Sequence, residues 1–114
     1  MSPQPAFDGS WTVTAYRSGD EIAVPDDRIE AQLVVEDGRI SGSMGVNRFA
    51  GEIGDGLPVG ALAVTRMAGP AELMAQEDIL LEHLQSADAI EVVDDGMFLT
   101  RGGLFVMELE RRGT

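Results

Sequence analysis

The sequence predicts an α+β protein that is mostly β: a curved antiparallel sheet or small barrel of about seven or eight strands with one helix. Most of the chain consists of short alternating apolar and polar runs separated by turn residues, the pattern of half-buried strands. One stretch, residues 69–87, has helical spacing instead. Because helices do not alternate with strands along the chain, a doubly wound α/β fold is excluded.

The chain begins with a lead-in and a first strand. Residues 1–8 contain two prolines and are predicted to form a flexible lead-in to a single domain, residues 9–112. The run SWTVTAYR, residues 10–17, alternates and is predicted to be a strand. One face of that strand is formed by Trp11, Val13 and Ala15. The polar runs SGDE and VPDD separate it from the next element.

A β-hairpin is predicted next. Apolar side chains alternate between residues 29 and 35, and Asp37–Gly38 then supplies the two positive-φ positions of a type I′ turn. The returning strand of this hairpin covers residues 39–42. Two further strands are predicted over residues 47–54 and near residues 61–65.

The helix and the final strands complete the chain. Pro70 stands at a helix-opening position, and Glu72 in the first turn favours the positive end of the helix dipole. The apolar face of the helix is assigned to Leu73, Leu80, Leu81 and Leu84. Two tight turns, at Asp95–Gly96 and Gly102–Gly103, are predicted to join three closing strands. These strands cover residues 89–95, 96–101 and 103–112.

Composition limits the classes of partner. A chain of 114 residues forms one domain, and 44% apolar with 25% charged residues is typical of a globular protein. The net charge is −12, and all eight basic residues are arginines. Such a negative potential repels phosphate backbones and anionic lipids, so nucleic acid is not expected as a partner. No segment approaches the roughly 20 apolar residues of a membrane span, so no membrane insertion is expected.

The residues that usually carry chemistry are sparse. The sequence has no cysteine and one histidine, His83, which is predicted to be solvated on the helix flank. A lone histidine builds neither a metal site nor a Ser–His–Asp triad, so no metal, cofactor or enzymatic activity is expected. Asp26–Asp27 and Asp94–Asp95 are interpreted as turn residues, with weak calcium binding at either pair as the less favoured alternative. Core filling is the role assigned to Met44, Met67, Met74, Met97 and Met107.

The segment SGSMGVNRFAG, residues 41–51, raises the question of a site. Asn47 and Arg48 could grip an anionic ligand, but the favoured interpretation is structural: Asn47 satisfies backbone groups and Arg48 pairs with a nearby carboxylate. Glu77 lies at the centre of the apolar helix face, where an unpaired carboxylate is costly. We therefore expect Glu77 to accept hydrogen bonds from backbone N–H groups or from Arg48, Arg66, Asn47 or Thr65. The alternative is a catalytic role as a desolvated general base, which is not favoured because the sequence offers no second catalytic group.

Two motifs in the sequence, GVNRFAG (45–51) and TRMAGP (65–70), precede the helix segment ELMAQEDILLEHL (72–84). In this order and spacing they resemble the META domain family, to which HslJ-like heat-inducible proteins belong. A Trp-containing first strand, GSWTV, and the run GRISG also agree, so the resemblance extends from about Phe7 to Arg111. The motif residues that it marks are Asn47, Arg48, Phe49, Thr65, Arg66, Met67 and Glu77.

The chain departs from the family pattern at two positions. Val46 and Gly69 stand where the family motifs carry cysteines, and the resemblance implies that those cysteines form a disulfide. Many members of the family are exported or lipid-anchored, whereas loss of both cysteines suits a reducing compartment, so a cytoplasmic location is expected. If the fold is shared, the Cα atoms of Val46 and Gly69 should lie within about 7 Å.

The resemblance implies no established biochemical activity. The first expectation is a non-catalytic META-type domain that acts as a stress-associated or protein-interaction module, with an unknown protein partner. The alternative is a small-ligand-binding β-barrel, in which apolar residues from 98–107 line an interior pocket for a small apolar ligand. An interior packed with side chains supports the first expectation, and a sizeable cavity supports the second.

Overall fold

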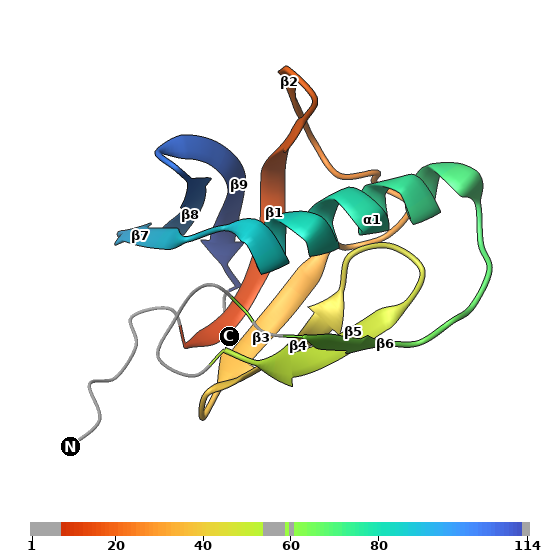
Figure 1. Ribbon diagram of the computed structural model, residues 1–114, viewed down its shortest axis with the longest axis horizontal. Helices are drawn as coiled ribbons and strands as arrows, with labels where there is room; N and C mark the ends of the chain where they lie inside the picture. The colour runs from red at the N-terminus through yellow and green to blue at the C-terminus, as the bar shows by residue number, and fades with distance from the viewer. Residues whose placement is uncertain (1–7, 54–58, 60, 113–114) are drawn as a thin grey trace.

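The computed structural model describes residues 8–53, 59 and 61–112 (Figure 1). Within these residues the chain forms nine strands and one helix, which confirms the mostly β, α+β class. The elements are β1 (Gly9–Ser18), β2 (Glu21–Ala23), β3 (Gln32–Glu36), β4 (Arg39–Ser43), β5 (Arg48–Glu52), β6 (Leu62–Val64), α1 (Ala71–Ser86), β7 (Ala89–Val93), β8 (Gly96–Arg101) and β9 (Leu104–Arg111). The predicted lead-in falls mostly on residues 1–7, which lie outside the described residues.

All the strands belong to one antiparallel sheet. Its order is β6-β5-β4-β3-β1-β9-β8-β7, and β2 pairs with the end of β1. Among the described strands, β6 and β7 form the two ends of this path and do not pair with each other. The sheet is therefore curved and open, and the barrel form of the prediction is not found. Strand β2 was missing from the prediction because its three residues are too few to show alternation.

Most tight turns follow the sequence signals. Asp37 and Gly38 have φ values of 55° and 79°, and Gly102 and Gly103 have 58° and 84°, as a type I′ hairpin requires. The third hairpin differs from the prediction by one residue. Val93 pairs with Gly96, so its turn residues are Asp94 and Asp95, with Asp94 at φ 56°.

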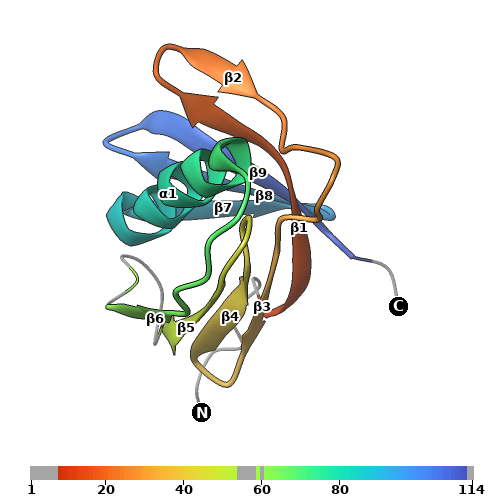
Figure 2. The same cartoon turned by 90° about the vertical axis from the view of Figure 1, so that its right-hand side faces the viewer.

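Helix α1 lies inside the curve of the sheet, between the β4–β6 half and the β7–β9 half (Figure 2). Pro70 precedes its first residue, as predicted. Its buried positions recur every three or four residues, the spacing of one helix face. They are Leu73, Gln76, Glu77, Leu80, His83 and Leu84. Leu81, which the sequence interpretation placed on this face, is only partly buried. No helix in the described part of the chain is long and apolar enough to cross a bilayer.

The core is formed by both halves of the sheet and the helix. Trp11 is fully buried in β1 and receives the Arg111 guanidinium over its ring at 4.3 Å. A register shift between Val13 and Ala15 against β9 leaves Ala15 half-buried and turns Tyr16 inward, which corrects the predicted face of this strand. Met67 is 57% exposed, so its assignment to the core was wrong, whereas Met44, Met97 and Met107 are buried.

Candidate functional site

The loop between β4 and β5 packs directly against helix α1. An ideal Cβ atom on Gly45 would lie 2.5 Å from the Leu73 carbonyl oxygen and 2.9 Å from Glu77 Cβ. Real Cβ atoms do not approach backbone oxygens this closely, so only glycine permits the contact. The glycine brings the backbone of the following residues within hydrogen-bonding reach of the helix.

Glu77 uses this contact to hold the loop. Its side chain is 3% exposed. The carboxylate oxygen Oε1 accepts hydrogen bonds from the backbone N–H groups of Val46 at 2.8 Å and Asn47 at 2.5 Å. The second oxygen, Oε2, accepts one from Asn47 Nδ2 at 2.9 Å. Three donors therefore compensate for the burial of the carboxylate.

Asn47 extends this contact to a third segment. Its side chain is 4% exposed, and its Oδ1 accepts hydrogen bonds from the Met67 backbone N–H at 2.6 Å and from Thr65 Oγ1 at 3.0 Å. The Nδ2 group also donates to the Met67 carbonyl oxygen at 3.3 Å. Asn47 thus joins the segment after β6 to the β4–β5 loop and, through Glu77, to the helix. We call Glu77 and Asn47 with these hydrogen bonds the Glu77–Asn47 clamp.

Only part of the expected donor set serves Glu77. Asn47 and two backbone N–H groups donate to it, but Arg48, Arg66 and Thr65 do not. Thr65 Oγ1 instead accepts from the Arg48 backbone N–H at 3.0 Å. The expected pairing of Arg48 with a carboxylate is not found: its side chain is exposed, and no described residue forms an ion pair or hydrogen bond with its guanidinium. The reason is strand alternation, since Phe49 takes the inward position and Arg48 points outward.

A second buried polar side chain on the helix was missed. Gln76 is 5% exposed, donates from Nε2 to the Met44 carbonyl oxygen at 2.9 Å and accepts from the Asp26 backbone N–H at 2.7 Å. It ties the β2–β3 connection to the β4–β5 loop. Its position three residues after Leu73, on the same helix face, is the sequence signal that could have found it.

The Asp26 segment is further ordered by Arg28. The Arg28 guanidinium donates to both Asp26 carboxylate oxygens, at 2.9 and 2.7 Å, and the Arg28 backbone N–H donates to one of them at 2.9 Å. These hydrogen bonds lower the pKa of Asp26 to about 2. A depressed carboxyl pKa contributes stability above its unfolded value, near pH 4, and this contribution is lost as pH falls toward 2. The turn role predicted for Asp26 agrees with this geometry.

His83 is buried, which corrects the prediction of a solvated side chain. It is 7% exposed, and its Nε2 lies 2.7 Å from the Arg17 carbonyl oxygen. A carbonyl accepts, so Nε2 carries the proton of this hydrogen bond. His83 lies three residues after Leu80 and is therefore on the same face of the helix. In the sequence, the polar residues next to His83 obscure this periodicity. Among the described residues, no three His, Asp or Glu side chains gather closely enough to hold a metal ion.

Val46 and Gly69 are adjacent in space. An ideal Cβ on Gly69 would lie 3.4 Å from Val46 Cβ, close to the Cβ separation of a disulfide. With Cα–Cβ bonds of about 1.5 Å, the two Cα atoms are at most about 6.5 Å apart, within the predicted 7 Å. The same ideal Cβ on Gly69 would lie 2.6 and 3.1 Å from the two methyl carbons of Val46. The valine side chain thus fills the space beside the glycine.

The double substitution Val46→Cys with Gly69→Cys should form a disulfide and stabilise the protein. Closing a loop of roughly 24 residues contributes about 3 kcal/mol, equivalent to a Tm rise of about 10 °C for a chain of this size. Thermal unfolding with and without reductant measures the effect, and thiol titration checks that the bond is formed. Free thiols in the oxidised sample, or equal Tm values in the two conditions, would refute the predicted geometry.

The substitution Gly45→Ala should separate the loop from the helix. The added methyl group meets the helix backbone, which cannot rotate away as a side chain can, so a cost of about 2–3 kcal/mol is expected. Chemical denaturation measures it. Gly96→Ala is the matched control, because a Cβ there would have no neighbour closer than 3.4 Å. Equal losses in the two variants would contradict the close contact.

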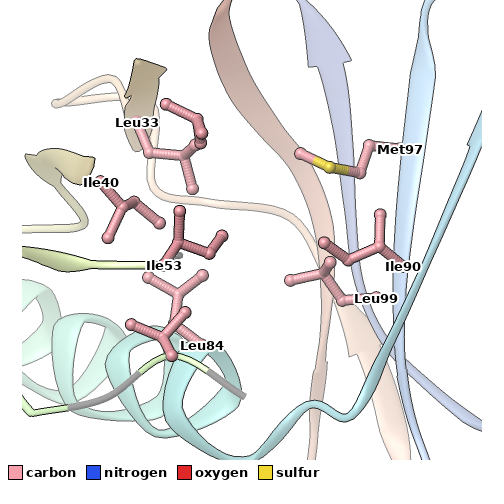
Figure 3. Close-up of a pocket in the computed structure, with 9 residues that line it drawn as sticks. Leu33, Ile40, Ile53, Leu84, Ile90, Met97 and Leu99 are labelled. Atoms are coloured by element: carbon pink, nitrogen blue, oxygen red, sulfur yellow. The ribbon is translucent and has the colours of Figure 1, made fainter. Parts of the chain in front are cut away.

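The interior between the two halves of the sheet is almost filled. Leu33, Ile40, Ile53 and Leu84 face Ile90, Met97 and Leu99 across an apolar cavity of about 10 Å³ (Figure 3). This is room for about one water molecule, whereas ligand pockets measure roughly 300–1,000 Å³. The cavity formed by the described residues therefore does not favour the interior-ligand alternative.

A larger hollow lies on the face of the β3–β6 half of the sheet that is opposite the interior cavity. It is an open groove of about 1020 Å³. The described residues that line it are Gln32, Val34, Ser41, Gly42, Ser43, Val46, Arg48, Phe49, Ala50, Ala63, Val64, Thr65 and Met67. Several of them are motif residues, and Arg48 is the only charged one. Arg66 is exposed but does not line the groove. We call this surface the outer groove.

These features define a class of protein: a small β domain with one helix, in which a helix carboxylate and an asparagine join the β4–β5 loop to the segment after β6, without a metal or disulfide in the described residues. Residues 4–112 match the META domain, and the chain belongs to this family. Its fold is similar to the NMR structure of a protein from Burkholderia xenovorans, with a TM-score of 0.78, 26% sequence identity and coverage of 94% of this chain and 83% of that one. Among curated proteins, no significant match is found.

Proposed function

We propose that this META domain is a non-catalytic, stress-associated module that binds a protein partner through the outer groove. One observation carries the proposal: the two family motifs divide their residues between the inside and the outside of the molecule. Asn47 serves the Glu77–Asn47 clamp, while its neighbours Val46 and Arg48 line the outer groove. In the second motif, Thr65 and Met67 each do both, because they donate hydrogen bonds to Asn47 and also line the outer groove. The clamp therefore fixes the shape of the groove.

The clamp itself offers little to a reaction. Both oxygens of Glu77 accept hydrogen bonds from the protein, and both polar atoms of the Asn47 side chain have protein partners. A general base needs a substrate proton within hydrogen-bonding reach, and a residue that is 3% exposed behind a packed loop does not provide that access. This supports the assignment of the motif to structure and of the groove to binding.

The proposal is tested by affinity capture from the native host. The wild-type chain, an Ala50→Glu variant and an Ala89→Glu variant are used as baits. Both alanines are exposed strand residues, but Ala50 lines the outer groove and Ala89 lies on β7 at the far end of the sheet. The wild-type and Ala89→Glu chains should retain the same protein, and Ala50→Glu should lose it. Identical capture by all three chains would overturn the proposed function.

The stress association and the location are tested separately. A strain that lacks the gene should grow more slowly than wild type after a heat shift, and the amount of captured partner should rise with the shift. We also propose a cytoplasmic location, because the position of the family disulfide is occupied by Val46 and Gly69. Cell fractionation with an antibody against the chain checks this location; recovery in an envelope fraction would contradict it.

A further inference from the structure

We propose that the outer groove binds an extended segment of the partner that carries a single acidic side chain flanked by apolar ones, with its carboxylate on Arg48. This inference rests on the proposed function and names the chemistry of the segment.

The lining side chains form two rows that cross four neighbouring strands. Strand pairing aligns one row as Gln32, Ser43, Arg48 and Thr65. It aligns the other row as Val34, Ser41, Ala50 and Ala63. With strands roughly 4.8 Å apart, each row is roughly 14 Å long, which matches four or five residues of extended chain at roughly 3.3 Å per residue. The groove therefore has the dimensions of a short peptide segment.

The two rows differ in what they offer a ligand. The second row consists of small side chains, so a bound segment can approach the sheet closely along it. In the first row, the Ser43 hydroxyl already donates to the Asn47 carbonyl oxygen and the Thr65 hydroxyl to Asn47 Oδ1. The Gln32 amide and the Arg48 guanidinium have no partner among the described residues, so these two groups are available for recognition.

Charge favours a single carboxylate. Arg48 is the only charged residue among the described residues that line the groove, in a chain whose net charge is −12. Its guanidinium can bind a carboxylate with two parallel hydrogen bonds. A segment with several negative charges would be repelled by the rest of the molecule, whereas one charge gains the contact at limited cost. Charge complementarity thus selects a segment that is acidic at one position and otherwise neutral.

Apolar neighbours and the open shape complete the assignment. Met67 is 57% exposed and lines the groove, and an adaptable thioether side chain suits contact with apolar residues of a partner. An enclosed pocket buries most of a small ligand, but an open groove leaves one side of its occupant uncovered. A segment that remains attached to a folded partner tolerates this exposure better than a free small molecule does. We therefore assign the occupant to a protein segment.

The test begins with a display library of random eight-residue segments, selected against the immobilised full-length chain. Sequences that survive counter-selection against Ala50→Glu are synthesised, and their Kd values are measured by titration. Each should contain one Asp or Glu beside Leu, Val, Ile or Met. Replacement of that acid by its amide should weaken binding at least tenfold. In ¹H–¹⁵N spectra, the backbone signals that move on binding should be those of outer-groove residues.

The protein variants assign the contact to Arg48. Arg48→Glu should weaken binding at least tenfold, and Arg48→Lys should weaken it less because the charge remains. Arg39→Glu changes the net charge by the same amount at an exposed position of β4 outside the groove, and should alter Kd less than twofold. Library sequences without an acid, or Kd values that Arg48→Glu leaves unchanged, would overturn this inference. The capture experiment with Ala50→Glu decides the proposed function independently of that result.

Discussion

Replacing Asn47 with alanine should lower the free energy of unfolding by about 3–4 kcal/mol. The variant loses the hydrogen bonds that the Asn47 side chain makes to Glu77, Thr65 and both backbone groups of Met67. Several of the groups left behind are shielded from water, so the lost partners are not fully replaced by solvent. For a chain of this size, the expected fall in Tm is roughly 12–16 °C.

Thermal unfolding followed by circular dichroism measures the Asn47→Ala effect. Gln85→Ala is the matched control, because Gln85 is an exposed amide side chain near the end of the helix. That variant should unfold within about 0.5 kcal/mol of wild type. A loss at position 47 no larger than the loss at position 85 would show that the hydrogen bonds of Asn47 do not hold the two loops.

The substitution Glu77→Gln should cost about 2–3 kcal/mol and lower Tm by roughly 8–12 °C. Both carboxylate oxygens of Glu77 accept hydrogen bonds from N–H donors. A glutamine amide has only one acceptor oxygen, so its NH₂ group must point toward one of these donors. The variant therefore loses one hydrogen bond, and two N–H donors face each other in a buried environment. The remaining hydrogen bonds also weaken, because a neutral carbonyl is a poorer acceptor than a carboxylate.

The same substitution on the exposed side of the helix provides the control for Glu77→Gln. Glu82 lies on helix α1 and is exposed, so Glu82→Gln removes an identical charge without breaking a hydrogen bond of the described residues. In urea unfolding, the Glu82→Gln control should have a free energy of unfolding near that of wild type, and Glu77→Gln should have a clearly lower one. Coincident unfolding curves for the two variants would mean that the buried carboxylate contributes nothing specific.

The inward position of Glu77 could be predicted from the sequence, but its full set of partners could not. Helical periodicity places Glu77 among the leucines, and the cost of burying a carboxylate requires donors. Which donors are used depends on the conformation of the β4–β5 loop, and Gly45 sets that conformation through a contact with the helix backbone. Such a contact joins segments distant in sequence, so no local pattern encodes it.

Two buried polar residues were missed for a related reason. Gln76 and His83 lie on the helix face that faces the sheet, three residues after Leu73 and Leu80. Hydrophobic patterning assigns polar residues to solvent unless a partner is known in advance. Their partners are backbone groups of Asp26, Met44 and Arg17, which the sheet topology brings to the helix. Pattern alone therefore underestimates the polar part of this core.

Arg48 shows the limit of reasoning from charge. The sequence interpretation paired it with a local carboxylate, as charge balance favours in an acidic chain. Alternation in β5 gives the inward position to Phe49, which is 3% exposed, and directs Arg48 to the outer groove. The ligand-binding alternative for Asn47 and Arg48 therefore applies to only one of the two residues. The side chain of Asn47 is occupied by internal hydrogen bonds, whereas the side chain of Arg48 is available for a partner.

A double-mutant cycle between Asn47→Ala and Glu77→Gln tests most directly whether the two side chains of the Glu77–Asn47 clamp act together in holding the loops to the helix. Four urea unfolding curves, for wild type, both single variants and the double variant, give the interaction energy. If the two side chains act together, the double variant should lose at least about 1 kcal/mol less than the two single losses combined. Losses that add within about 0.5 kcal/mol would mean that the two residues stabilise the fold independently, and the account of the clamp would be wrong.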